Sequence, residues 1–301
     1  MHPLFLLFPL LFLISCSQCT SQTTRAGAEK KSQQSEFIAS ASDSVFYDEV
    51  KKEILTNISG SGSLKFNDLI IITAKSFLGT PYVSSSLEIN ERETLIVDLR
   101  RVDCSTFVEY VLAFAYSLKK GETEFGDLAS ELQCLRYRDG QINGYASRLH
   151  YFSEWLKDNE ANGYLKLVSD SLGNESMDMK LNFMSTHPEL YAPLNKNPEL
   201  VEEIKSIEEN ISLNKMNYIS KGNIDNVQAY IENGDIIAFV TKVKGLDVSH
   251  TGFACFVNER LHILHASTRT NQVEISPVPL SNYIKNMSSV SGILVARPVY
   301  R

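Results

Sequence analysis

The sequence predicts an α+β fold in which helices come first along the chain and an antiparallel sheet follows. Apolar residues recur at helical spacing over much of the first two thirds, whereas after Gly222 they recur with a period of two, as in strands. Strands and helices do not alternate as they would in a doubly wound sheet, and there is neither a GxGxxG motif nor a phosphate-binding loop. We expect one large domain over residues 45–301, with a helical insertion at about residues 122–222.

The first fifteen residues predict an export signal. They carry no charged side chain, and Leu4 to Ile14 are almost all apolar. Because a permanent membrane-spanning helix needs about twenty apolar residues, we expect residues 1–15 to be a cleaved signal peptide. The run Leu13-Ile-Ser-Cys16 resembles the lipobox of bacterial lipoproteins, which implies a lipid on Cys16. Cys19 is a second candidate, and an ordinary secretory signal is the alternative.

Residues 16–44 predict a flexible tether. They are rich in Ser, Gln, Thr, Ala and Lys, and their only large apolar residues are Phe37 and Ile38. Such a segment cannot bury a core of its own. With the anchor on Cys16, it implies a lipoprotein of the bacterial cell envelope that is held at a membrane and faces the periplasm.

Charge and cysteine content narrow the functional class. The net charge of −7 and the lack of a clustered Lys/Arg stripe argue against a nucleic-acid partner. The predicted domain contains Cys104, Cys134 and Cys255, an odd number for an exported protein. At least one thiol is then unpaired, unless it pairs between chains, and a catalytic role would explain it.

Two helices are predicted in the first half of the domain. The spacing of Leu69, Ile72 and Phe77 predicts a helix over residues 68–78, which Gly79 and the following Pro81 end. A second helix begins at residues 103–106, and Gly121 ends it. Its apolar stripe consists of Phe107, Val111, Phe114 and Leu118.

The second half of the domain is predicted to begin with polar helices and to end with strands. Residues 127–217 are mostly helical, and one helix begins at Asn197 as N-cap with Pro198 in its first turn. This helix is predicted to be buried through Leu200, Ile204, Ile207 and Ile211. Strands of one sheet are predicted at residues 235–241, 250–257, 261–266, 273–277 and 292–297.

Cys104 is the candidate nucleophile. A thiol attacks as the thiolate, and the free N–H groups and dipole of a helix N-terminus favour that charge, so we expect a lowered pKa for Cys104. The same N–H groups could hold the oxyanion that forms when an amide carbonyl is attacked. The alternative is a small core residue, because position 104 continues the apolar stripe of its helix.

His250 is the candidate base and His265 the candidate for orienting it. His250 begins a strand 146 residues after Cys104, near the separation of about 130–150 in papain-like enzymes. If Asn258-Glu259 is a two-residue hairpin turn, His265 pairs with Gly252 on the face that carries His250, as a Cys/His/polar triad requires. A three-residue turn would put His265 on the other face, and the alternative role for His265 is that of a half-buried strand residue. His262 alternates to the opposite face, where we expect it to be solvated. We expect Cys134 and Cys255 to be inert.

Five motifs in order resemble the NlpC-type papain-like cell-wall cysteine peptidases. They are Gly79-Thr-Pro-Tyr, Asp103-Cys-Ser-Thr-Phe-Val-Glu, Gly234-Asp-Ile-Ile, Ser249-His-Thr-Gly and Leu264-His-Ala-Ser. The resemblance implies a papain-like fold in which the catalytic Cys begins a helix packed on an antiparallel sheet. The long insertion and the run from Ser147 to Trp155 look closest to the N-acetylmuramoyl-L-alanine amidase-like branch.

That branch implies cleavage of the amide between the lactyl group of N-acetylmuramic acid and L-Ala, with a preference for anhydromuropeptides. Carried over by position, Cys104 is the nucleophile, His250 the base and His265 the orienting residue. The residues implied or proposed to contact substrate are Tyr82, Asp103, Arg148, His150, Tyr151, Trp155 and Ser249. The charged and aromatic side chains between residues 148 and 155 suit contacts with a sugar. The alternative is that these residues form an amphipathic helix whose aromatic side chains pack in the core.

No cofactor and no metal is expected, because a thiolate replaces zinc-activated water and the histidines lack convincing ligand spacing. The expected partners are peptidoglycan fragments, and the membrane through the lipid anchor. Two alternatives stay open: an NlpC-type endopeptidase that cuts between D-Glu and diaminopimelate, and a non-catalytic lipoprotein that binds peptidoglycan.

Overall fold

A computed structural model of the chain describes residues 36–58, 64–88, 90 and 92–300. The predicted signal peptide, Cys16, Cys19 and most of the predicted tether lie outside the described residues. The described residues form one compact unit. None of the described helices is long and apolar enough to cross a membrane.

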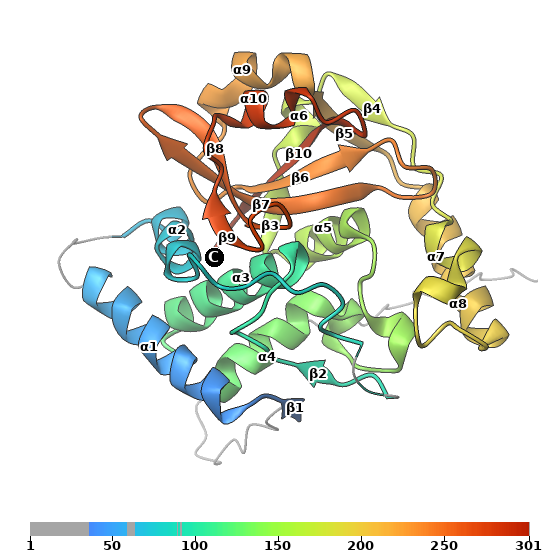
Figure 1. The fold of residues 1–301 in the computed structure, drawn as a ribbon, viewed down its shortest axis with the longest axis horizontal. Helices are drawn as coiled ribbons and strands as arrows, with labels where there is room; N and C mark the ends of the chain where they lie inside the picture. The colour runs from blue at the N-terminus through green and yellow to red at the C-terminus, as the bar shows by residue number, and fades with distance from the viewer. Residues whose placement is uncertain (1–35, 59–63, 89, 91, 301) are drawn as a thin grey trace, which may run out of the picture. The chain divides into compact units, whose positions relative to one another are not determined.

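Four helices form the first layer of this unit, drawn at the left and in the lower part of Figure 1. They are α1 (Ala41–Ile58), α2 (Phe66–Ser76), α3 (Cys104–Lys120) and α4 (Phe125–Arg136). The predictions of α2 and α3 are confirmed, and Gly121 ends α3 in the left-handed conformation with φ of 80°. Every residue of α3 from Thr106 to Ser117 is buried, because α2, α4 and the sheet all pack against it. The packing around this central helix therefore fixes the position of its N-terminus.

The folded part begins earlier than the predicted boundary at residue 44. Strand β1 (Phe37–Ile38) pairs in parallel with β2 (Leu95–Ile96), and Phe37 packs edge-on against Phe125. Asp43 is buried and accepts a hydrogen bond from the Leu99 N–H at 2.9 Å. The prediction of a tether up to residue 44 is therefore wrong for its last residues, because their few apolar side chains bury against a distant segment.

The second layer is an antiparallel sheet with the strand order β4-β5-β10-β6-β7-β8-β9, and β3 lies beside β10. The strands are β3 (Leu165–Leu167), β4 (Glu175–Met177), β5 (Met216–Ser220), β6 (Ile236–Thr241), β7 (Val248–Val257), β8 (Arg260–Ser267), β9 (Gln272–Ile275) and β10 (Val290–Pro298). All five predicted strands are present. Mixed helices with an antiparallel sheet confirm the predicted α+β class.

The segment at residues 122–222 is largely helical, as predicted, but it also supplies β3, β4 and β5. Besides α4, its helices are α5 (Phe152–Ala161), α6 (Ser169–Leu172), α7 (Phe183–Thr186) and α8 (Pro198–Ser212). Its 3-10 turns are η1 (Arg138–Gly140), η2 (Tyr145–Ser147), η3 (Pro188–Leu190) and η4 (Lys221–Asn223). The Asn197 side chain accepts from the Leu200 N–H, which confirms the predicted cap of α8. Strands of three to five residues are too short to show a period, which is why the sequence did not reveal them.

A third layer covers the other face of the sheet (Figure 1). It contains α9 (Ile224–Val227), η5 (Gln228–Tyr230) and α10 (Leu280–Lys285). Alternate residues of β6 enter two different cores: Ile237 and Phe239 pack on this layer, and Ala238 and Val240 pack on the side of α3. The sheet is therefore buried on both faces, and the site lies where β7 meets the start of α3.

Candidate active site

The backbone around Cys104 is held by a reciprocal cap of α3. The Asp103 carboxylate accepts from the Thr106 N–H at 2.8 Å, and the Thr106 hydroxyl accepts from the Asp103 N–H at 2.9 Å. The Phe107 N–H is bonded to the Asp103 carbonyl. Cys104 is the first helical residue, so its N–H and that of Ser105 remain among the first-turn donors that helical geometry leaves free. The predicted helix start at residues 103–106 is confirmed.

The Cys104 thiol is protonated in the resting site. Burial, and then the charge of Asp103, raises the pKa of Cys104 to about 12. The Thr251 N–H, the Ser105 hydroxyl and the Cys104 N–H oppose this shift, because each can donate to a thiolate. The expectation of a lowered pKa is therefore wrong: removal from water outweighs the helix N-terminus. A base is needed to take the thiol proton.

His250 and His265 form a hydrogen-bonded pair on one face of the sheet. His250 Nε2 lies 2.6 Å from His265 Nδ1, and the two rings are perpendicular. Burial, and then the neighbouring His265, lowers the pKa of His250 to about 3. Burial lowers the pKa of His265 to about 4. Both rings are therefore neutral at pH 7, and one ring nitrogen of His250 is left to act outside the pair.

The hairpin between β7 and β8 produces this pairing. Asn258 and Glu259 have φ of 48° and 62°, as a two-residue turn requires, and Phe253 pairs with Leu264. The predicted two-residue turn is confirmed, and Gly252 lies opposite His265. A Cβ atom on Gly252 would lie 2.7 Å from the His265 Cβ and 2.6 Å from the Leu264 carbonyl oxygen. Only glycine leaves room for the imidazole at this point.

Gly252→Ala is expected to displace His265 and to lower the free energy of unfolding by about 1–3 kcal/mol through overpacking. The matched control is Gly222→Ala, since a Cβ there meets nothing within 4 Å, and it should change stability by less than about 0.5 kcal/mol. Urea unfolding of both variants measures the difference. Equal stability of the two variants would show that β8 moves aside readily.

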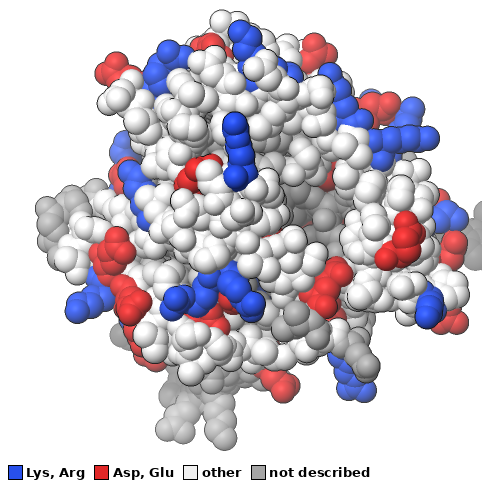
Figure 2. Space-filling view, in the orientation of Figure 1, with Lys and Arg blue, Asp and Glu red and all other residues white. Residues whose placement is uncertain are grey.

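Two neighbouring cavities adjoin the first turn of α3, and both are lined by Ser105, His150 and Phe152. The first, of about 170 Å³, is also lined by Cys104, Tyr151, Met184, Tyr191, Leu246, Asp247, Val248, Ser249, His250 and Thr251. We call it the thiol cavity. Cys104 and His250 face it together, although among the described residues no hydrogen bond joins them. On the face drawn in Figure 2 the surface is hollowed beside the part that covers α7 and α8.

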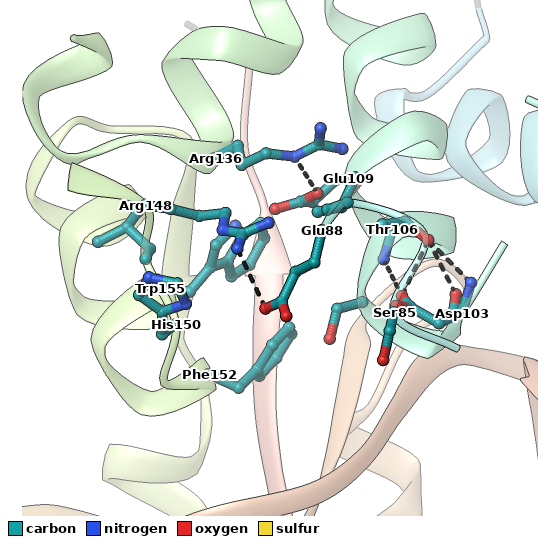
Figure 3. A pocket seen from close by; sticks show the side chains of 13 residues that line it. Ser85, Glu88, Asp103, Thr106, Glu109, Arg136, Arg148, His150, Phe152 and Trp155 are labelled. Carbon is teal, nitrogen blue, oxygen red and sulfur yellow. Dashed lines mark hydrogen bonds and ion pairs between the residues drawn. The ribbon is translucent and has the colours of Figure 1, made fainter. Parts of the chain in front are cut away.

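The second cavity, of about 230 Å³, is lined mainly by charged and aromatic side chains, and we call it the charged cavity. Figure 3 shows Arg148, His150, Phe152 and Trp155 on one side of it and Ser85, Asp103 and Thr106 on the other. Glu88 extends between the two sides and forms an ion pair with Arg148 at 3.4 Å. The cavity suits a polar ligand with both donors and acceptors.

The structure brings most of the predicted substrate-binding residues to these two cavities. Arg148 is buried in ion pairs with Glu88 and Glu93, and His150 hydrogen-bonds the Tyr145 carbonyl oxygen at 2.8 Å. Burial, and then the charge of Arg148, lowers the pKa of His150 well below its usual range. Tyr151 donates to Glu208 at 2.6 Å.

Trp155 is buried and stacks on Phe152, with ring centroids 5.0 Å apart. Trp155 therefore shapes the wall of the charged cavity from within the core. Ser249 is exposed at the thiol cavity, and Asp103 lines the charged cavity. Burial, and then the charges of Cys104 and Asp103, raises the pKa of Tyr82 to about 12.

Several lining residues were not predicted. Glu109 and Arg136 form a buried ion pair beside the charged cavity, and Asp247 accepts from the Ser153 N–H at the thiol cavity. The available signal for Glu109 was a charged residue within the apolar middle stretch of α3, from Phe107 to Tyr116. His262, predicted to be solvated, is buried and hydrogen-bonds the Ser276 carbonyl oxygen at 2.7 Å, because the segment that follows β9 lies against it. Among the described residues no group of His, Cys, Asp and Glu side chains could hold a metal ion.

Comparisons with known proteins find one matching family and several similar solved structures. A family described as N-acetylmuramoyl-L-alanine amidase-like matches residues 72–293. The crystal structure of an N-acetylmuramoyl-L-alanine amidase from Bacteroides uniformis is 35% identical, covers 84% of this chain and 100% of that chain, and superposes with a TM-score of 0.73. A Bacteroides fragilis protein provisionally named a xylanase is 41% identical over 74% of this chain and 98% of its own, with a TM-score of 0.71.

A protein from Legionella pneumophila, 21% identical over 84% of this chain and 94% of its own, shares the fold with a TM-score of 0.63. No curated protein matches the chain.

Proposed function

The chain belongs to the N-acetylmuramoyl-L-alanine amidase-like family, and from this premise we propose that it cleaves the N-acetylmuramoyl-L-alanine amide of peptidoglycan fragments with Cys104 as nucleophile. The observation that carries the proposal is the thiol cavity, which Cys104 and His250 line together, while His250 Nε2 is hydrogen-bonded to His265 Nδ1. We also propose that the frame is related to the NlpC-type papain-like peptidases, because the catalytic cysteine begins a helix packed on an antiparallel sheet.

The proposed reaction begins with proton transfer. His250 Nδ1 takes the Cys104 proton as the sulfur bonds to the lactyl carbonyl carbon, and the carbonyl becomes an oxyanion. The C–N bond then breaks, the L-Ala nitrogen receives the proton from His250, and a thioester remains. Water gives a proton to His250 and attacks the thioester, and the sulfur leaves and is reprotonated. The free N–H groups of Cys104 and Ser105 are placed to stabilise the oxyanion.

The same geometry assigns a role to the His250–His265 hydrogen bond. If His250 donates through Nε2 to His265 Nδ1, the lone pair on His250 Nδ1 is available to the thiol. His265 thereby holds the tautomer and the ring direction of the base, as the third member of a triad does. In an unliganded site the thiol and the base need not be bonded, because such bonds often form only with substrate present.

The pKa values of the site predict its pH dependence. His250 acts as a base only when neutral, and its lowered pKa keeps it neutral well below the ordinary histidine value of about 6.5. The proposed reaction starts from the protonated thiol of Cys104, and the raised pKa keeps this thiol protonated at mildly alkaline pH. We expect kcat/KM on a soluble muropeptide to stay constant from about pH 6 to 8.5. A loss of activity centred near pH 6.5 would contradict a buried, neutral His250.

The charged cavity is the proposed site for the sugar and stem-peptide groups next to the scissile amide. Arg148 and Glu88 supply donors and acceptors, and Phe152 and Trp155 supply the aromatic wall, which together suit a ring with hydroxyl and amide substituents. We propose direct or shape-defining contacts for Arg148, His150, Tyr151, Trp155, Ser249, Tyr82 and Asp103.

The test is mass spectrometry of a purified anhydromuropeptide after incubation with the protein. A free stem peptide that begins with L-Ala, together with the free sugar, supports the amidase. A cut between D-Glu and diaminopimelate would identify an endopeptidase, and an intact ligand that binds without turnover would identify a binding protein. Cleavage between sugars would identify a glycosidase, which uses two carboxyl groups as acid and base or nucleophile. Glu88 and Glu109 at the charged cavity do not suit these roles, because each forms an ion pair with an arginine.

We further propose that residues 1–15 are a signal peptide, that a lipid on Cys16 anchors the domain at a membrane facing the periplasm, and that the following residues up to about 36 are a tether. Incorporation of a labelled fatty acid that is lost in Cys16→Ala and kept in Cys19→Ala would support the anchor. Incorporation that survives Cys16→Ala would refute it.

A further inference from the structure

The far side of His265 faces a carboxylate that the proposed triad does not use. His265 is 1% exposed, and its Nε2 has no hydrogen-bond partner among the described residues. Leaving a buried imidazole nitrogen without a partner costs about 1–3 kcal/mol, so the neighbourhood of this atom needs an explanation. Glu274 Oε1 lies 3.9 Å from it and is the acidic group nearest to the ring.

The register of the sheet holds these two side chains together. His265 on β8 and Glu274 on β9 are directly paired residues, so both side chains leave the same face of the sheet at neighbouring positions. Glu274 has 18% of its side chain exposed, which leaves its carboxylate partly in contact with water while one oxygen points at the buried ring. The order across the strands is then His250 on β7, His265 on β8 and Glu274 on β9.

We propose that Glu274 is a positioning residue that completes a Cys104–His250–His265–Glu274 array by fixing the tautomer of His265. The inference rests on the proposed function, since it assumes that His250 is the base. The carboxylate accepts only, so it favours the tautomer of His265 that carries its proton on Nε2. His265 Nδ1 must then accept from His250 Nε2–H, and this leaves the lone pair of His250 Nδ1 for the thiol proton.

The opposite tautomer would disable the site. If His265 donated through Nδ1, His250 Nε2 would accept and the proton of His250 would sit on Nδ1, where the base must be free. Glu274 therefore acts on the chemistry through two rings without touching substrate. The separation of 3.9 Å exceeds a hydrogen bond, and we expect it to shorten when the His250–His265 pair takes the proton and becomes positively charged.

The other groups that face His265 do not provide this acceptor. Tyr283 of α10 packs edge-on against the ring with centroids 5.4 Å apart, and its hydroxyl is hydrogen-bonded with Ser267 and not with His265 Nε2. Arg269, after the end of β8, is exposed and acts through its charge on Tyr283, and a cation cannot accept from Nε2–H. His250 already occupies Nδ1. Among these neighbours Glu274 is the acceptor available to the buried nitrogen.

The test compares Glu274→Leu and Glu274→Gln with Glu175→Gln, which changes an exposed glutamate on the opposite edge strand β4. We expect Glu274→Leu to lower kcat by about 10- to 100-fold with little change in KM, as loss of an outer orienting partner does elsewhere. Glu274→Gln keeps an acceptor oxygen and should restore part of the rate. Glu175→Gln should match the wild-type protein.

A readout independent of turnover separates this inference from the proposed function. Nitrogen-15 NMR of labelled histidines reports which nitrogen of His265 carries the proton, and it should show Nε2–H in the wild-type protein and a mixture in Glu274→Leu. The acid limb of kcat/KM should also move to lower pH in Glu274→Leu, because the carboxylate no longer stabilises the protonated pair. An unchanged tautomer, or a kcat for Glu274→Leu within twofold of wild type, would overturn the inference. If the wild-type protein cleaves no muropeptide, the NMR comparison still decides the role of Glu274.

Discussion

Replacement of Cys104 by alanine is expected to abolish amide cleavage while the fold and the free energy of unfolding change little. The sulfur is the atom that bonds to the substrate carbonyl in the proposed reaction, so its removal takes away the proposed nucleophile. Loss of a triad nucleophile leaves only the rate enhancement that binding and the oxyanion donors provide, which corresponds to a drop of several orders of magnitude in kcat. The measurement is stem-peptide release followed by mass spectrometry, together with circular dichroism to establish that the variant is folded.

The matched control is Cys255→Ala, because Cys255 is a buried thiol on β7, the strand that also carries His250. Burial raises its pKa, and it packs in the core on the side of α3, so its loss should leave kcat near the wild-type value. His250→Ala is expected to lower kcat by about 10²–10⁴-fold, the usual contribution of a general acid–base group. Full activity of Cys104→Ala would contradict the cysteine mechanism. Loss of activity in both Cys104→Ala and Cys255→Ala would indicate that removal of a thiol disturbs the structure.

The elements that the sequence predicted well are those whose signal is local. Helix α3 has a cap at Asp103, a long apolar stripe and a terminating glycine at position 121, and all three act within a few residues of the chain. The β7–β8 hairpin was predictable because a two-residue turn fixes the register, and the register in turn places His265 opposite Gly252. The relation between His250 and His265 therefore follows from counting along one hairpin.

The features that were missed depend on contacts between distant segments. Strands β1 and β2 are two residues each and exist only because they pair with one another, and β3 is fixed by its pairing with β10. The pKa of Cys104 was predicted in the wrong direction because helix position is visible in the sequence and depth of burial is not. Glu274 went unnoticed for a similar reason: its relation to His265 is a cross-strand pairing between β8 and β9, whose register no predicted turn had fixed.

The largest expected effect on stability comes from separating Arg136 and Glu109. The Arg136 guanidinium donates to Glu109 at 2.8 Å and to the Ile96 carbonyl oxygen at 2.7 Å, and the two charged side chains are only 1% and 7% exposed. This pair joins the end of α4 to the middle of α3 and to β2. Removing one partner leaves an uncompensated buried charge, so Arg136→Met should lower the free energy of unfolding by about 3–5 kcal/mol in urea titrations at pH 7.

The pH dependence of that loss identifies its cause. Burial raises the pKa of Glu109 and the charge of Arg136 lowers it, so removal of Arg136 raises it further. A folded-state pKa above the unfolded value means that the folded protein binds the additional proton, and stability then decreases as pH rises from the unfolded pKa of about 4.3 toward the folded one. Arg136→Met should therefore be less destabilised at pH 5 than at pH 7.

The double variant Arg136→Met/Glu109→Leu should recover most of the loss, because an apolar pair of similar size leaves no buried charge. Lys205→Met is the surface control, since its ion pair with Glu202 on α8 is exposed and should contribute less than about 0.5 kcal/mol. If the double variant were as unstable as Arg136→Met, the loss would come from the Ile96 hydrogen bond and the packing of the arginine stem. If it is stable, the charged pair is dispensable for folding, and the place of Glu109 beside the charged cavity becomes the better reason for its presence in a helix that is otherwise apolar at that turn.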